Sequence, residues 1–116
     1  MPATENALLV LTTLPDAATA ERLATALVER RLAACVNQMA PCRSHYRWQG
    51  AVQHDSEVPL LIKTSAGRYA ALEAAIRELH PYELPEIIAV DIVRGLPAYL
   101  DWVTAETVPG PSESAV

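Results

Sequence analysis

The stretch HPYELPEII, at residues 80–88, gathers a histidine, a tyrosine, two glutamates and two prolines ahead of an apolar run. One interpretation is chemical: His80 binds a metal ion, and Tyr82, Glu83 and Glu86 support it. The other is structural, because Pro81 disfavours helical dihedrals at His80 and the two prolines leave the connector few free torsions. An imidazole where a helix ends could then hydrogen-bond the last carbonyl groups. We favour the structural interpretation and keep His80 as a candidate metal ligand.

Cys35 is the second candidate metal ligand. Cu(I) favours sulfur and imidazole, so a soft site would recruit Cys35 together with Met39, Cys42 or a histidine. However, C-x3-M-x2-C is not a recognised ligand spacing, and Pro41 disturbs the strand between the two cysteines. The alternative, which we favour, is that Cys35 is a small buried hydrophobic residue, as free cysteines commonly are.

Lys63 is the only lysine in the chain and follows the apolar residues 60–62. It either extends its ammonium group into solvent at a strand end, which we favour, or binds an anion in a cleft between subunits. Tyr46 and Trp48 alternate with Arg47 on a predicted strand, which puts both aromatic rings on one face. We expect these rings to dock on a neighbouring subunit.

His45 and His54 flank the predicted hairpin, and we expect both to be exposed on the surface. The chain has no P-loop and no GxSxG, HExxH or GxGxxG motif, so we predict no enzyme.

Strand and helix patterns alternate along the chain. A continuous apolar run indicates a buried strand, Asp16 can cap the helix after it, and Gln49-Gly50 suggests a hairpin tip. Ser65 can cap a second helix, and Pro41 predicts a bulge or an edge. The predicted strands are 7–13, 34–39, 51–64 and 86–93, and the predicted helices are 17–33, 66–79 and 98–106.

This order predicts an α+β fold of the ferredoxin-like type, β-α-β-β-α-β, with a long central hairpin and a C-terminal helix. Both main helices cover the same face of the sheet in this fold. The predicted strands ALLVL, PLLIK and EIIAVDIV are nevertheless apolar at odd and even positions alike. A large exposed apolar patch is uncommon in monomers, so we predict an oligomer that buries sheet faces between subunits.

Composition limits the remaining classes. The 116 residues fit one domain, for which we expect residues 1–108, with a disordered tail at 109–116. The net charge of −5 argues against nucleic-acid binding, which needs a basic surface. We expect no membrane span, because the apolar run near the start is too short for one. The two cysteines form no disulfide framework, which indicates a cytoplasmic location.

At this point the chain resembles the CutA family, the divalent-cation-tolerance proteins. The resemblance covers about residues 7–104. The segments that carry it are LTTLPD near the start, RLAACVN at 31–37, SHYRWQG at 44–50, EVPLLIKT at 57–64, HPYELPEII at 80–88 and YLDW at 99–102.

The resemblance implies a ferredoxin-like subunit, a homotrimer similar to the PII signalling proteins, and a role in tolerance of divalent metals, above all copper. Copper or another divalent metal is the implied cofactor, and none is obligatory. Some family members carry a cysteine at the position of Thr12 and a histidine at that of Leu79, both proposed as copper ligands. This chain retains only His80 of that set. The alternative is a PII-like sensor whose inter-subunit clefts, lined by Lys63, Trp48, Tyr82 and Glu83, bind a small ligand or a partner protein.

Overall fold

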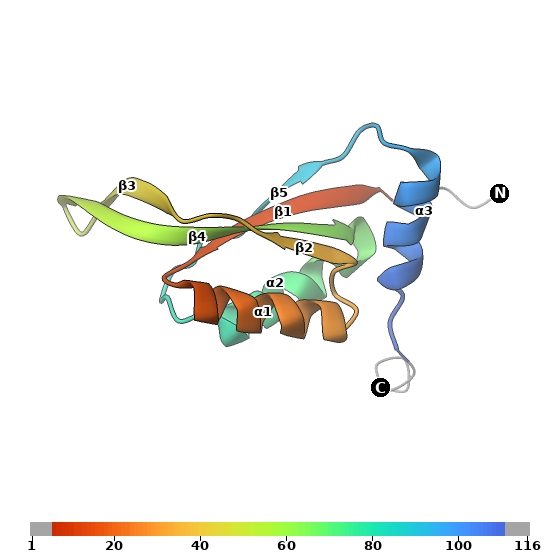
Figure 1. The fold of residues 1–116 in the computed structure, drawn as a ribbon, viewed down its shortest axis with the longest axis horizontal. Helices are drawn as coiled ribbons and strands as arrows, with labels where there is room; N and C mark the ends of the chain where they lie inside the picture. Colours follow the sequence, from red (N-terminus) through yellow and green to blue (C-terminus); the bar gives the residue numbers. More distant parts are fainter. Residues whose placement is uncertain (1–5, 111–116) are drawn as a thin grey trace.

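Five strands form one antiparallel sheet in the structure, a computed structural model that describes residues 6–110 (Figure 1). The strand order is β2-β4-β1-β5, and β3 pairs with the other half of the long strand β4. The elements are β1 (Ala7–Leu14), α1 (Ala17–Glu29), β2 (Cys35–Gln38), β3 (Cys42–Trp48), β4 (Ala51–Ser65), η1 (Ala66–Arg68), α2 (Tyr69–Leu79), β5 (Ile88–Asp91) and α3 (Pro97–Glu106). The predicted α+β class is confirmed.

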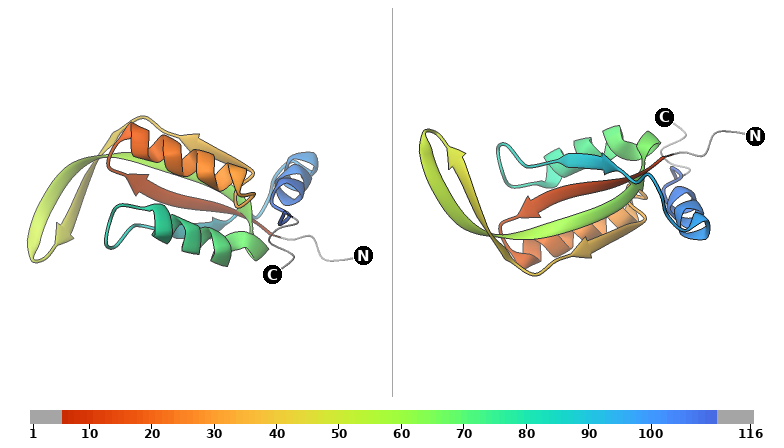
Figure 2. Two further views of the ribbon diagram at one scale, coloured as in Figure 1. Left: turned by 90° about the horizontal axis from the view of Figure 1, so that it is seen from below. Right: turned by 90° about the horizontal axis from the view of Figure 1, so that it is seen from above.

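Helices α1 and α2 cover one face of the sheet, and the β3–β4 hairpin extends beyond them (Figure 2). Even-numbered residues of β1 and of the second half of β4 point to the helices, because strand side chains alternate between faces. The core lies between these layers. Its fully buried side chains include Val10, Leu14, Leu27, Leu60, Ile62, Leu72 and Ile76.

Helix α1 begins as predicted but ends earlier than the expected Ala33. The Asp16 carboxylate accepts a hydrogen bond from the Thr19 backbone N–H at 2.8 Å, which caps the first turn. The helix ends because Arg31 adopts a left-handed conformation with φ of 58°. The Arg31 guanidinium compensates by donating hydrogen bonds to the backbone oxygens of Val108 and Ala105, at 2.8 and 3.2 Å. These bonds attach the end of α3 and the residues that follow it to the end of α1.

The expected strand after α1 ends at Gln38, and a new strand begins at Cys42. Proline lacks the N–H that a ladder needs, so the interruption at Pro41 separates β2 from β3. The predicted hairpin tip is confirmed: Gln49 and Gly50 both have positive φ, 51° and 81°, as a two-residue type I′ turn requires.

Ser65 does not cap the second helix, contrary to the prediction. Its side chain makes no cap hydrogen bond, and its hydroxyl pairs with the Thr107 hydroxyl at 2.9 Å instead. Residues Ala66–Arg68 form a 3₁₀ turn, and α2 begins only at Tyr69. Both hydroxyl groups are buried, so this bond joins α3 to the end of β4.

The last expected strand, 86–93, is shorter in the structure, where β5 covers Ile88–Asp91. The residues before it belong to the connector that starts at Pro81, and those after it lead to α3. Pro97 occupies the first turn of α3, where its missing N–H has no partner to lose. The tail expected at 109–116 lies outside the described residues from position 111 onward.

Candidate functional site

The face of the sheet away from α1 and α2, here called the open face, is largely apolar. Strand pairing aligns its residues in two rows across the sheet. One row contains Cys35, Lys63, Leu9 and Val90, and the other contains Asn37, Leu61, Leu11 and Ile88. Ile88 and Val90 remain 52% and 51% exposed, whereas Val10 and Ile62, which face the helices from β1 and β4, are fully buried. The structure therefore has an uncovered apolar stripe with polar groups at its β2 end.

Those polar groups form the Lys63 corner, made of Lys63, Asn37, Cys35 and Tyr99. The Lys63 ammonium group donates a hydrogen bond to the Asn37 side-chain oxygen. The Cys35 Sγ lies 4.0 Å from the same oxygen. Burial, followed by the neighbouring Cys35 side chain, raises the pKa of the Tyr99 hydroxyl. Lys63 is thus half-buried at the edge of the apolar stripe, with one polar partner beside it.

His80 belongs to a second group, the His80 cluster, made of His80, Tyr82, Glu57 and Thr13. Its backbone is extended (φ −81°, ψ 136°), so α2 ends at Leu79 as the following proline requires. The ring atom Nε2 lies 2.7 Å from the Thr13 backbone oxygen, and Nδ1 lies 3.1 Å from the Tyr82 backbone nitrogen. Because the Tyr82 N–H is a donor, Nδ1 is the acceptor and Nε2 carries the proton.

Burial lowers the pKa of His80, although the hydrogen bond to Thr13 and the nearby Glu57 oppose the shift. The imidazole is therefore neutral, and both of its nitrogens have backbone partners. A metal ion at His80 would have to displace one of these two hydrogen bonds. These two backbone hydrogen bonds agree with the favoured structural interpretation of His80.

Glu57 is the buried carboxylate of the His80 cluster, with 9% of its surface exposed. One of its oxygens accepts hydrogen bonds from the Tyr82 hydroxyl at 2.8 Å and from the Thr13 hydroxyl at 3.2 Å. Burial, then the bond to Glu57, raises the pKa of Tyr82 well above its ordinary value. Sequence reasoning missed Glu57; the apolar residues that follow it were the available signal that it sits at the edge of the core.

The two predicted metal ligands lie far apart. Thr13, the partner of His80, pairs with Pro59 on β4, whereas Cys35 pairs with Lys63. Four residues of strand separate these positions by about 13 Å, too far for one ion to bind both within a chain. Within residues 6–110, no three His, Cys, Asp or Glu side chains gather at metal-binding spacing.

The remaining predicted residues lie at the surface. Tyr46 and Trp48, 41% and 38% exposed, share one face of the β3–β4 hairpin as predicted. The Tyr46 hydroxyl donates a hydrogen bond to Asp55 on that face. Glu83 is exposed on the connector before β5. Trp48 is thus distant along the hairpin from Lys63, and the two do not meet within a chain.

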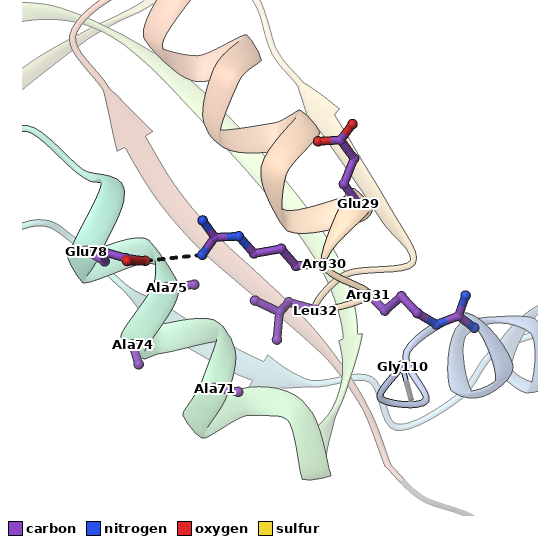
Figure 3. Close-up of a pocket in the computed structure, with 9 residues that line it drawn as sticks. All are labelled: Glu29, Arg30, Arg31, Leu32, Ala71, Ala74, Ala75, Glu78 and Gly110. Atoms are coloured by element: carbon purple, nitrogen blue, oxygen red, sulfur yellow. Dashed lines mark hydrogen bonds and ion pairs between the residues drawn. The ribbon is translucent and has the colours of Figure 1, made fainter. Parts of the chain in front are cut away.

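A groove of about 630 Å³ lies between the end of α1 and α2, on the helix side of the molecule (Figure 3). Ala71, Ala74 and Ala75 line it from α2, and the ion pair between Arg30 and Glu78, at 3.2 Å, crosses it. It contains none of the predicted site residues. Among the described helices, none combines the length and the hydropathy needed to span a bilayer.

These features place the chain in a structural class: small antiparallel α+β proteins that have a long hairpin and an uncovered apolar sheet face. A family model described as CutA1 divalent ion tolerance protein matches residues 8–106. The chain therefore belongs to the CutA divalent-cation-tolerance family, as the segments quoted above suggested.

Two curated relatives illustrate the similarity. The divalent-cation tolerance protein CutA of Thermus thermophilus is 47% identical over 98 residues, which cover 84% of this chain and 95% of that protein. Protein CutA of the mouse is 45% identical over 91 residues, or 78% of this chain, and the match spans only 51% of the mouse protein.

Solved structures agree with the fold. A divalent cation tolerance protein (Cut A1) from Thermus thermophilus superposes with a TM-score of 0.86 at 45% identity, covering 88% of this chain and 99% of the other. The protein described as the periplasmic divalent cation tolerance protein CutA of Archaeoglobus fulgidus gives 0.85 at 33% identity, covering 88% and 99%. This chain and these relatives therefore share one overall fold.

Proposed function

We propose that this protein acts in tolerance of divalent metals, with copper foremost, as a non-enzymatic trimeric module that binds metal or regulates the response to it. Membership of the CutA family supports the metal-tolerance role, because the matching family and several relatives carry that description. Growth of a strain lacking the gene, in rising copper concentrations, tests it. We expect this strain to grow less well in copper than the parent strain, and re-expression of the gene to restore growth. Equal copper sensitivity of the two strains would contradict the proposal.

The assembly rests on one observation, the uncovered apolar rows of the open face. Leu9, Leu11, Ile88 and Val90 lie side by side there, and water contact with such an area is unfavourable. We interpret the subunit as the ferredoxin-like split βαβ arrangement, in which a second layer on this face must come from other chains. Three copies that pack these faces together remove the apolar stripe from water.

Sedimentation at micromolar concentration tests the assembly directly. A particle of about three times 12.6 kDa is the expected result. A folded 12.6 kDa particle would contradict the trimer.

For copper, Cys35 and His80 remain the proposed ligands. Their separation within one chain means that a shared ion would require ligands from different subunits, and His80 would give up a backbone hydrogen bond. Copper titration of the wild-type protein, His80→Ala and Cys35→Ser tests each residue. Equal affinity of all three proteins would remove both residues from the copper site.

A second candidate function is binding of a small ligand or partner protein in clefts between subunits, lined by Lys63, Trp48, Tyr82 and Glu83. The observation that favours it is the Lys63 corner, where the ammonium group bonds the Asn37 side-chain amide at the edge of the apolar stripe. A small anion would fit this chemistry. Thermal-shift screening with small anionic metabolites tests it, since a bound ligand raises the melting temperature and Lys63→Gln should remove the effect.

We also propose a cytoplasmic location, on the two cysteines without a disulfide framework. Cys35 and Cys42 are free thiols in the structure. The Archaeoglobus relative is described as periplasmic, which differs from the location proposed for this chain. Cell fractionation with antibody detection tests it, and recovery in the periplasmic fraction would contradict it.

A further inference from the structure

The β3–β4 hairpin carries two histidines that face each other across the strands. His45 and His54 are direct partners in the antiparallel register, so their side chains leave the same face of the hairpin. The Nδ1 atoms lie 2.6 Å apart, and the ring centroids lie 4.6 Å apart with the planes at 82°. Both residues are exposed. Nothing in the His80 cluster or the Lys63 corner uses this pair.

The short nitrogen–nitrogen distance defines the chemistry of the pair. Two lone pairs facing each other would repel, so one ring donates its Nδ1–H and the other accepts it. A divalent metal ion can take the place of this shared proton. The ring that donated then carries its proton on Nε2 instead, so the two neutral imidazoles become two ligands without a change in their net charge.

We propose that His45 and His54 form a bidentate site for a divalent transition-metal ion of the copper, nickel and zinc class. Imidazole nitrogen suits these ions, whereas magnesium and calcium prefer oxygen. Metal–nitrogen bonds of about 2.0–2.1 Å place two ligand nitrogens about 2.9 Å apart in a cis square-planar site and about 3.4 Å apart in a tetrahedral one. The pair has to open by less than about 1 Å, which rotation of two exposed rings allows. Solvent supplies the remaining ligands.

The surroundings of the pair determine its accessibility and its affinity. Tyr46 and Asp55 lie on the opposite face of the hairpin, so docking of the aromatic face on another subunit leaves the histidines in solvent.

Arg43 and Arg47 are the neighbours of His45 on its own face and strand, and their positive charges weaken cation binding. Such a site has modest affinity and prefers the ions that bind imidazole most strongly. The Irving–Williams order places Cu²⁺ above Ni²⁺ and Zn²⁺.

This site is independent of the proposed function, because a surface pair can bind metal whether or not the protein acts in metal tolerance. It is also separate from Cys35 and His80. Titration of the intact protein with Cu²⁺, Ni²⁺, Zn²⁺ and Mg²⁺ by calorimetry tests it. We expect one ion per chain at this site for the first three metals, tightest for Cu²⁺, and no response to Mg²⁺.

Substitution of the ligands identifies the site. His45→Gln or His54→Gln should weaken Ni²⁺ and Zn²⁺ binding at least about tenfold, because each removes one of two protein ligands. The double variant should abolish binding at this site. Val52→Ala, the matched control on the same face of β4, should leave the affinity unchanged.

A second measurement assigns the ligands without relying on the variants. In NMR spectra of the wild-type protein, Zn²⁺ should shift the imidazole signals of His45 and His54 and leave those of the buried His80 in place. Wild-type affinity in the double variant, or a shift confined to His80, would overturn the proposal. So would the absence of any response to Cu²⁺, Ni²⁺ or Zn²⁺ up to about 1 mM.

Discussion

The imidazole of His80 donates a hydrogen bond from Nε2 to the Thr13 backbone oxygen, at 2.7 Å, and so connects the end of α2 to β1. Its other nitrogen accepts a hydrogen bond from the Tyr82 backbone N–H. The pair of bonds fixes both the tautomer and the position of the ring. Pro81 contributes by ending the helix at the residue before His80, which turns the ring toward the sheet.

Protonation of His80 should destabilise the folded state. Burial lowers its pKa below the ordinary value of 6.5, so as pH falls through 6.5 the unfolded chain takes up a proton that the folded chain does not. The contribution of neutral His80 to the free energy of unfolding is complete above pH 6.5. It is lost as the pH falls from 6.5 to the lowered pKa of the folded state. We expect the unfolding free energy to fall more between pH 7.5 and 5 in the wild type than in His80→Gln, at equal protein concentration. Parallel pH profiles would contradict this role.

Tyr82→Phe should destabilise the protein by about 1–2 kcal/mol, because the half-buried hydroxyl donates to the buried Glu57 carboxylate. The matched control is Tyr46→Phe, which removes a similar hydroxyl–carboxylate bond on the exposed hairpin. Its effect should be smaller, since Tyr46 and Asp55 are both exposed within the chain, whereas Glu57 is buried. Chemical denaturation of the three proteins measures both changes. An equal loss in the two variants would indicate that burial of Glu57 does not matter.

The buried bond between Ser65 and Thr107 should behave as a coupled pair. Thr107→Val leaves the Ser65 hydroxyl without its partner and should cost about 1–3 kcal/mol, and Ser65→Ala should also destabilise. The double variant should cost less than the sum, because neither side then leaves an unpaired hydroxyl. A double-mutant cycle by denaturant unfolding measures the coupling energy. Additive effects would mean that the two hydroxyl groups contribute independently.

A charge on the open face should separate the proposed trimer into monomers. Ile88→Asp introduces a carboxylate into the apolar rows, where burial between subunits would be strongly unfavourable. Val28→Asp is the control, an exposed valine on α1 at the helix side of the molecule. Sedimentation should give a smaller particle for Ile88→Asp alone. The same particle size for both variants would place the subunit contacts elsewhere.

Local sequence signals predicted the elements well. Asp16 caps α1 and Pro97 starts α3 because each acts through its own neighbours, with no need of distant partners. The turn at Gln49-Gly50 also set the register of the hairpin. His45 and His54 each lie four residues from this turn, so the sequence contained the signal for their pairing, although only the structure made it evident.

The sequence by itself determined the family, the order of strands and helices, and the doubly apolar pattern of the sheet, because these depend on local propensity and on the alternation of side chains. The tertiary structure alone decided the partners of the polar groups. Ser65 bonds Thr107 rather than capping a helix, and both nitrogens of His80 bind backbone groups. Such partners are distant in the chain, so only the packing of β1, β4 and the helices brings them within hydrogen-bonding distance.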